Sequence, residues 1–223
     1  MTVFKSNTWM CLLQCVVIAL VGWGIGLYFW GDLPEPMPVH WDGAGNPDGF
    51  APRWLGISFG PLTSLLIPLV ILFVTRFDPR RDHVDRSAKH LETIVLGTSI
   101  FGLVIQALTL HAAMSEEMTL DPTWIMVLVG GLFIVIGNAL PKFGSNFFIG
   151  IRTPWTLSSE KVWHKTQRLG GILFVLGGFA MMLLPFLGFT GNLLVGAILA
   201  ISFGAALIPA GYSWWIYQQE ARG

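Results

Sequence analysis

The sequence has little charge. Only 12% of its 223 residues are Asp, Glu, Lys or Arg, while 53% are hydrophobic. A soluble domain carries roughly 25% charged residues, so this chain has too few charged side chains to cover a surface that faces water. The 13 basic and 13 acidic residues also cancel, which argues against direct nucleic-acid binding because that needs a basic surface. The expected surroundings of the chain, and its first partner, are therefore a lipid bilayer.

Catalytic and metal-binding signatures are missing as well. The sequence contains no P-loop, no G-x-S-x-G motif and no H-E-x-x-H motif. Its two cysteines, Cys11 and Cys15, lie four residues apart in an apolar run without a further ligand nearby. We interpret them as packing residues on one helix face. The sequence thus predicts a protein that is not an enzyme, with no catalytic residues, no cofactor and no metal site.

Long uncharged stretches are what the sequence does have. A helix needs about 20 largely apolar residues to cross about 30 Å of hydrocarbon. The predicted transmembrane helices lie within residues 6–31, 54–75, 93–115, 122–141, 169–187 and 192–217. The last two are separated by the turn residues Pro185, Gly188 and Asn192. No Asp, Lys or Arg lies within these stretches, which disfavours an ion-driven pump, since such proteins use intramembrane charges.

The distribution of Lys and Arg predicts the orientation. With the N-terminus in the cytoplasm, 12 of the 13 basic residues, Lys5 among them, fall on the cytoplasmic side, and only Arg53 falls outside. The positive-inside rule therefore predicts that both termini are cytoplasmic.

The expected outer loop, residues 32–53, is rich in turn residues, and its Val-His-Trp segment predicts a short strand after three prolines. Three interpretations stay open. Asp42 and Asp48 accept backbone N–H bonds within turns, or they join His40 in holding a metal ion, or His40 and Trp41 form a recognition surface. The candidate ligand- or partner-recognition residues are His40, Trp41, Asp42, Gly45, Asn46, Pro47 and Asp48.

The expected cytoplasmic loop, residues 138–168, begins where Pro141 ends the fourth helix. Ser158 as N-cap and Glu160 in the first turn predict an amphipathic helix over 159–168 that lies at the membrane interface. Such a loop either rests on anionic lipid or docks a cytosolic protein or a lipid phosphate. The candidate docking residues are Asn138, Pro141, Lys142, Asn146, Arg152, Thr153, Pro154, Trp155, Ser158, Ser159, Glu160, Trp163, Lys165 and Arg168.

Both loops resemble a known family. The run 137–171, centred on G-I-R-T-P-W-T-L-S-S-E at 150–160, closely resembles the SdpI-type immunity protein family. The segments M-P-V-H-W at 37–41 and G-N-P-D-G at 45–49 are similar to the domain of unknown function commonly found at that family's amino end. Gln167 departs from the pattern, because family members often carry His there.

The resemblance implies a bacterial multipass protein of the plasma membrane. Its best-understood relatives protect a cell from a secreted, membrane-active toxin peptide, and some also draw a cytosolic transcriptional repressor to the membrane. We therefore expect an immunity or signalling protein. Two alternatives stay open: a small permease or channel, with helices broken by Pro61 and Pro68, and a metal-dependent membrane enzyme that uses the outer loop.

The expected fold is an all-α membrane protein. It consists of a six-helix transmembrane bundle with cytoplasmic termini, an ordered outer loop and an amphipathic helix in the inner loop. We divide the chain into a first helical hairpin with the outer loop at 1–75, a basic cytoplasmic loop and third helix at 76–122, and an SdpI-like region at 123–223.

Overall fold

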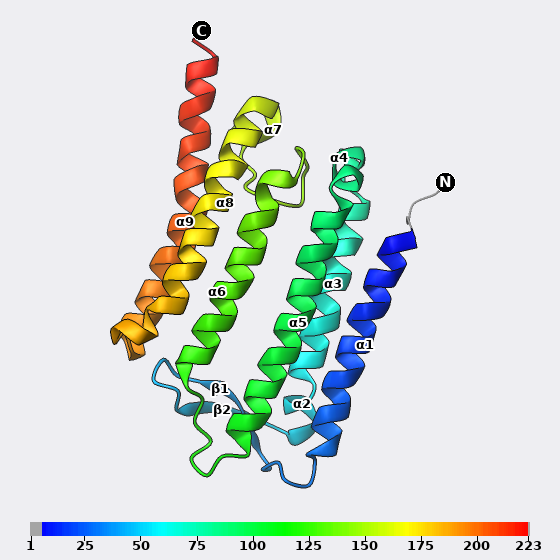
Figure 1. Cartoon of the computed structure of the whole chain (residues 1–223), viewed down its shortest axis with the longest axis vertical. Coiled ribbons are helices and arrows are strands. Elements are labelled where there is room, and N and C mark those ends of the chain that lie inside the picture. Colours follow the sequence, from blue (N-terminus) through cyan, green and yellow to red (C-terminus); the bar gives the residue numbers. More distant parts are fainter. Residues whose placement is uncertain (1–5, 223) are drawn as a thin grey trace.

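The computed structural model describes residues 6–222, and most of them lie in helices that follow the long axis of the molecule (Figure 1). Six of these helices are long and apolar enough to cross a membrane. They are α1 (Ser6–Tyr28), α3 (Phe59–Arg76), α5 (Ala88–Ala113), α6 (Pro122–Ala139), α8 (Glu160–Leu183) and α9 (Gly191–Glu220). The predicted all-α, six-helix membrane bundle is confirmed. Lys5, which contributed to the orientation argument, lies outside the described residues.

Short elements join the long helices. The helical turn α2 (Arg53–Gly56) precedes α3, and α4 (Arg81–Arg86) lies between α3 and α5. The 3₁₀ turn η1 (Leu140–Lys142) follows α6, the one-turn helix α7 (Pro154–Ser158) precedes α8, and η2 (Pro185–Leu187) precedes α9. The helix α3 is continuous through Pro61 and Pro68, so the break that the permease alternative assumed is absent.

The amphipathic helix expected at 159–168 is present, but it is not separate. It forms the first turns of α8 and continues into the membrane-spanning part. The prediction of a separate helix that ends at residue 168 was wrong, because α8 continues to Leu183, and Val162, Trp163 and Thr166 are fully buried in the protein. Burying a large aromatic side chain such as Trp163 is favourable, so this part of α8 packs against the bundle and does not lie among lipid headgroups.

The long helices form two groups. Helices α1, α3 and α5 pack against one another, α8 packs between α6 and α9, and the groups meet where α5 contacts α6 (Figure 1). Glycines bring α6 and α8 close together: a Cβ atom on Gly137 would lie 2.8 Å from the carbonyl oxygen of Gly171. Gly130 and Gly178 make the same kind of contact about two helical turns away from this pair. Close backbone approach of this kind is the usual basis of helix packing in lipid.

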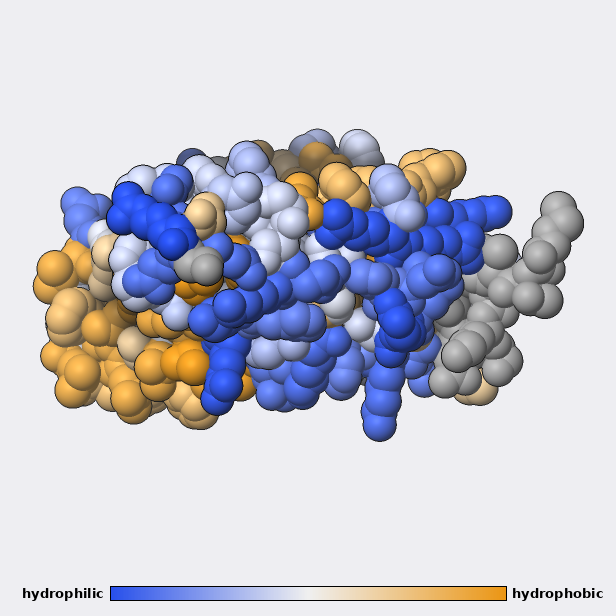
Figure 2. All heavy atoms as spheres, turned by 90° about the horizontal axis from the view of Figure 1, so that it is seen from above, coloured by the Kyte–Doolittle hydropathy of each residue, from blue (hydrophilic) through white to orange (hydrophobic). Residues whose placement is uncertain are grey.

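The two ends of the bundle differ. Strands β1 (Met37–Trp41) and β2 (Pro47–Ala51) form an antiparallel hairpin at one end, which confirms the predicted strand. The first turn of α1, the last turn of α9, α4 and α7 lie at the opposite end (Figure 1). We call these the hairpin end and the terminal end. Hydrophilic side chains gather across the terminal end, while hydrophobic ones mark the flanks (Figure 2).

Candidate functional site

The turn of the hairpin is held by Asp42. Its Oδ1 accepts hydrogen bonds from the backbone N–H groups of Ala44 (2.8 Å) and Asn46 (2.9 Å), and its Oδ2 accepts from the side-chain amide of Asn46 (3.2 Å). These bonds, with the Asn46 backbone N–H first, hold the pKa of Asp42 below its ordinary value of 3.8. Gly45 has a φ of +88° and faces the carbonyl of Leu120, a conformation and a closeness that require glycine. Three of the predicted loop residues therefore build the turn itself.

The other polar residues of the hairpin have different roles. The indole Nε1 of Trp41 donates to the carbonyl of Met118 (2.8 Å), which ties the hairpin to the loop between α5 and α6. The side chain of His40 is 73% exposed, and its Nδ1 lies 2.5 Å from Oδ1 of Asp48. Asp48 thus pairs with His40, whereas Asp42 accepts bonds inside its own turn. In the part of the chain that the structure describes, no group of three or more His, Cys, Asp or Glu side chains could hold a metal ion.

An apolar cavity of about 320 Å³ lies beneath the hairpin. Its walls come from α5, α6 and α9, and its roof is the segment 39–43 of β1 and the turn. The helical residues that line it are Ile105, Thr109, Pro122, Ile125, Met126, Leu194, Val195 and Ile198. Thr109 is the polar exception on these helices, so the site combines apolar walls with a polar roof. Such a chamber suits an apolar group that arrives from the membrane or along its surface.

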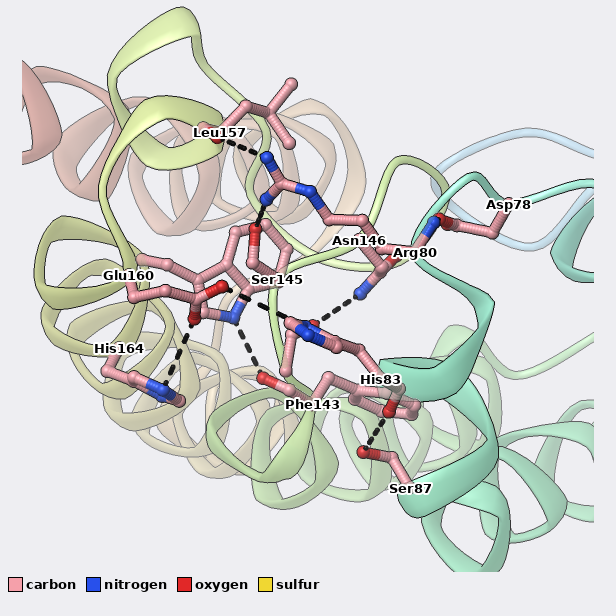
Figure 3. A network of polar contacts seen from close by, with 12 residues as sticks. Asp78, Arg80, His83, Ser87, Phe143, Ser145, Asn146, Leu157, Glu160 and His164 are labelled. Carbon is pink, nitrogen blue, oxygen red and sulfur yellow. Dashed lines mark hydrogen bonds and ion pairs between the residues drawn. The ribbon is translucent and has the colours of Figure 1, made fainter.

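At the terminal end, the loop between η1 and α7 is fastened by the segment that links α3 to α4 (Figure 3). Asp78 is 5% exposed and accepts from the backbone N–H groups of Arg80 (2.7 Å) and Phe147 (2.7 Å). The guanidinium of Arg80 donates to Ser145 Oγ and to the carbonyl of Leu157 (2.7 Å). We call Asp78 and Arg80 the clamp. No sequence pattern marks the clamp, because in the sequence Arg80 is only one of several basic residues near the end of α3.

A carboxylate joins two histidines beside the clamp. Glu160 at the start of α8 lies 3.9 Å from Nδ1 of His83 and 3.7 Å from Nε2 of His164 (Figure 3). Both pairs become ionic only when the histidine is protonated. Among the described residues, Nδ1 of His83 has no hydrogen-bond partner.

Two predicted docking residues, Asn146 and Trp163, are fully buried and cannot contact a partner. Oδ1 of Asn146 accepts from the N–H groups of Phe148 (3.0 Å) and Ile149 (2.6 Å), and Nε1 of Trp163 donates to the carbonyl of Phe143 (2.8 Å). These two side chains therefore stabilise the conformation of the loop and are not part of its exposed surface. Their roles differ from the predicted docking role for two reasons. An Asn side chain readily accepts hydrogen bonds from the backbone of its own turn, and a buried indole N–H needs a hydrogen-bond acceptor inside the protein.

The remaining docking residues divide by exposure. Thr153 and Ser159 cap α7 and α8, so the predicted N-cap at Ser158 was one residue too early. Thr153 also bonds to Ser213 of α9 (2.9 Å), and Trp155, like these two caps, is partly buried. The exposed members are Asn138, Pro141, Lys142, Arg152, Pro154, Ser158, Glu160, Lys165 and Arg168. The exposed basic side chains, Lys142, Arg152, Lys165 and Arg168, therefore lie on η1, the loop and α8.

Comparisons with known proteins agree with the two loop motifs. Residues 142–213 match the model of the SdpI/YfhL protein family, and residues 17–72 match that of a domain of unknown function, DUF1648. The curated "Immunity protein SdpI" of Bacillus subtilis (strain 168) is 27% identical over 207 residues, which covers 92% of this chain and 94% of that protein. No solved structure matches the chain.

Proposed function

Because residues 142–213 belong to the SdpI/YfhL protein family, we propose that this chain is a membrane immunity protein that protects a bacterium from a secreted, membrane-active toxin peptide. Its similarity to an immunity protein along nearly the whole length of both chains supports this function. The protein would lie in the plasma membrane with both termini in the cytoplasm, so that the hairpin end faces outward. That orientation follows the positive-inside rule.

The observation that carries the proposal is the cavity of about 320 Å³ beneath the hairpin. Its apolar walls match the apolar side chains of a membrane-active peptide, and the exposed pair of His40 and Asp48 offers polar contacts at the rim. Binding there would hold the peptide at the membrane surface and keep it from inserting. This function requires no bond to be made or broken.

The terminal end would serve the second part of the function, which is recruitment of a cytosolic repressor. The clamp fastens the loop, and the exposed side chains of Arg152 on the loop and Lys165 on α8 supply positive charge. A fluorescent repressor encoded beside the gene should move to the membrane in cells that express the chain. The charge-removing double variant Arg152→Gln and Lys165→Gln should leave it in the cytosol.

Immunity is tested by expression in a sensitive bacterium that is challenged with toxin peptides, including those encoded beside this gene. Cells with the chain should survive a peptide concentration that kills cells with an empty vector. Ile105→Trp, which fills the cavity, should reduce protection at an unchanged membrane level of the protein. The matched control is Ile100→Trp on the same helix, because Ile100 is exposed on the lipid side.

The outcomes separate two claims. Failure to protect against any peptide tested would refute the immunity function. Equal protection by the two tryptophan variants would leave immunity in place but remove the cavity as the binding site.

A further inference from the structure

A second hollow, of about 420 Å³, lies at the terminal end of the bundle and is lined by residues of α6, η1 and α8. Its upper rim carries Asn138, Lys142 and Arg168, all of which are exposed. Gly137 and Gly171 form its floor, where the two helix backbones meet without intervening side chains. The close packing of the two glycines therefore creates the hollow. We call it the α6–α8 groove.

The rim of the α6–α8 groove has an uncompensated positive charge. Nζ of Lys142 donates to Oδ1 of Asn138 (3.4 Å), a contact that leaves its charge unneutralised. Within residues 6–222, neither Lys142 nor Arg168 forms an ion pair with a carboxylate. Two cations at one rim attract an anion, and a phosphate group can take hydrogen bonds from both.

Below the rim the groove is apolar. Ile172 and Leu176 follow Arg168 by four and eight residues on α8, so they lie on the same helix face, with Leu176 about 12 Å deeper. They are 49% and 60% exposed, and they belong to the part of α8 that crosses the membrane. The hollow thus runs from headgroup level into the hydrocarbon layer.

We propose that the α6–α8 groove binds one anionic phospholipid. The phosphate of the lipid would contact Lys142 and Arg168, and one acyl chain would lie along Ile172 and Leu176. A cytosolic protein does not suit this site, because its apolar half lies at the depth of lipid tails. A soluble phosphate compound would leave that half empty. The assignment does not depend on the immunity function.

The test uses the purified full-length protein and native mass spectrometry with phosphatidylglycerol or phosphatidylcholine. We expect one phosphatidylglycerol to stay bound where phosphatidylcholine does not. The variant Lys142→Gln with Arg168→Gln should bind it about 25-fold more weakly, since a Lys or Arg near an anionic lipid contributes about a factor of five. The matched control is Arg86→Gln with Arg222→Gln, which removes two exposed charges at the same end of the bundle and should bind normally.

Three results would overturn the proposal: equal binding of the two lipids, an equal loss in the control variant, or displacement of the lipid by glycerol 3-phosphate at a similar concentration. The last result would indicate a headgroup site without a place for an acyl chain. If the double variant does not fold by circular dichroism, Arg168→Gln alone is measured, and a loss of about fivefold is expected.

Discussion

Removing the carboxylate of the clamp should loosen the loop between η1 and α7. In Asp78→Ala, the N–H groups of Arg80 and Phe147 each lose an acceptor at 2.7 Å. The bond to Phe147 matters most, because it joins two segments that are 69 positions apart in the chain. Asp78→Asn keeps one acceptor oxygen and should have about half the effect.

The size of the effect follows from the type of bond. A hydrogen bond to a charged group contributes about 1.5–3 kcal/mol to the free energy of unfolding, so the loss of two should cost at least about 3 kcal/mol. For a chain of this length, about 1 kcal/mol corresponds to a shift of roughly 2–4 °C in the unfolding temperature. The expected decrease for Asp78→Ala is therefore at least about 6 °C.

The assay is thermal unfolding of the purified protein in detergent, together with hydrogen exchange at the amide of Phe147, which should speed up in the variant. The matched control is Asp82→Ala in the neighbouring helix α4, where the side chain is exposed and the expected cost is below about 1 kcal/mol. If Asp78→Ala lowers the unfolding temperature no more than Asp82→Ala does, the clamp does not hold the loop.

Three further predictions concern other parts of the fold. Gly137→Ala should destabilise the protein by about 1–3 kcal/mol, because its Cβ would clash with the backbone of α8, whereas Gly131→Ala on the same helix meets nothing within 4 Å and should be neutral in thermal unfolding. The hairpin turn is stabilised by ionised Asp42 above pH 3.8 and loses this contribution as the pH falls through its lowered pKa; the protection of the turn amides against hydrogen exchange, relative to the intrinsic exchange rate at each pH, should therefore fall in acid, and Asp42→Asn should abolish that loss of protection. A membrane-impermeant maleimide should label His40→Cys but not Lys165→Cys in intact cells, since both native cysteines are buried; the opposite pattern would invert the proposed orientation.

Hydropathy and turn chemistry were enough to predict the bundle, the first strand of the hairpin and the turn that follows it, but not the pairing with β2. The predicted features depend on residues close together in the chain: an uncharged run long enough to span lipid, or turn residues that follow a strand. The start of α8 was mispredicted, because its amphipathic pattern suits a surface helix as well as one that packs on a bundle. The burial of Val162, Trp163 and Thr166 decides between them, and the bond from Trp163 to the carbonyl of Phe143 agrees with it.

The sites were less accessible to sequence reasoning. The role of Asp42 could be predicted as a turn acceptor, since its partners lie within four positions. The clamp and the cavity could not, because each joins segments far apart in the chain. Arg80 and Leu157, for example, are 77 positions apart, and no local pattern marks either residue as a partner of the other.

The hairpin also connects the two regions of the chain that match family models, residues 17–72 and 142–213. It lies within residues 17–72, yet Gly43 at its turn rests on α9, where an added Cβ would lie 2.9 Å from Val195 and 3.0 Å from the carbonyl oxygen of Gly191. A chimera that takes its amino-terminal half from one relative and its carboxyl-terminal half from another must therefore preserve this contact. The halves are interchangeable only where a glycine at the turn meets a carboxyl-terminal helix with a matching surface.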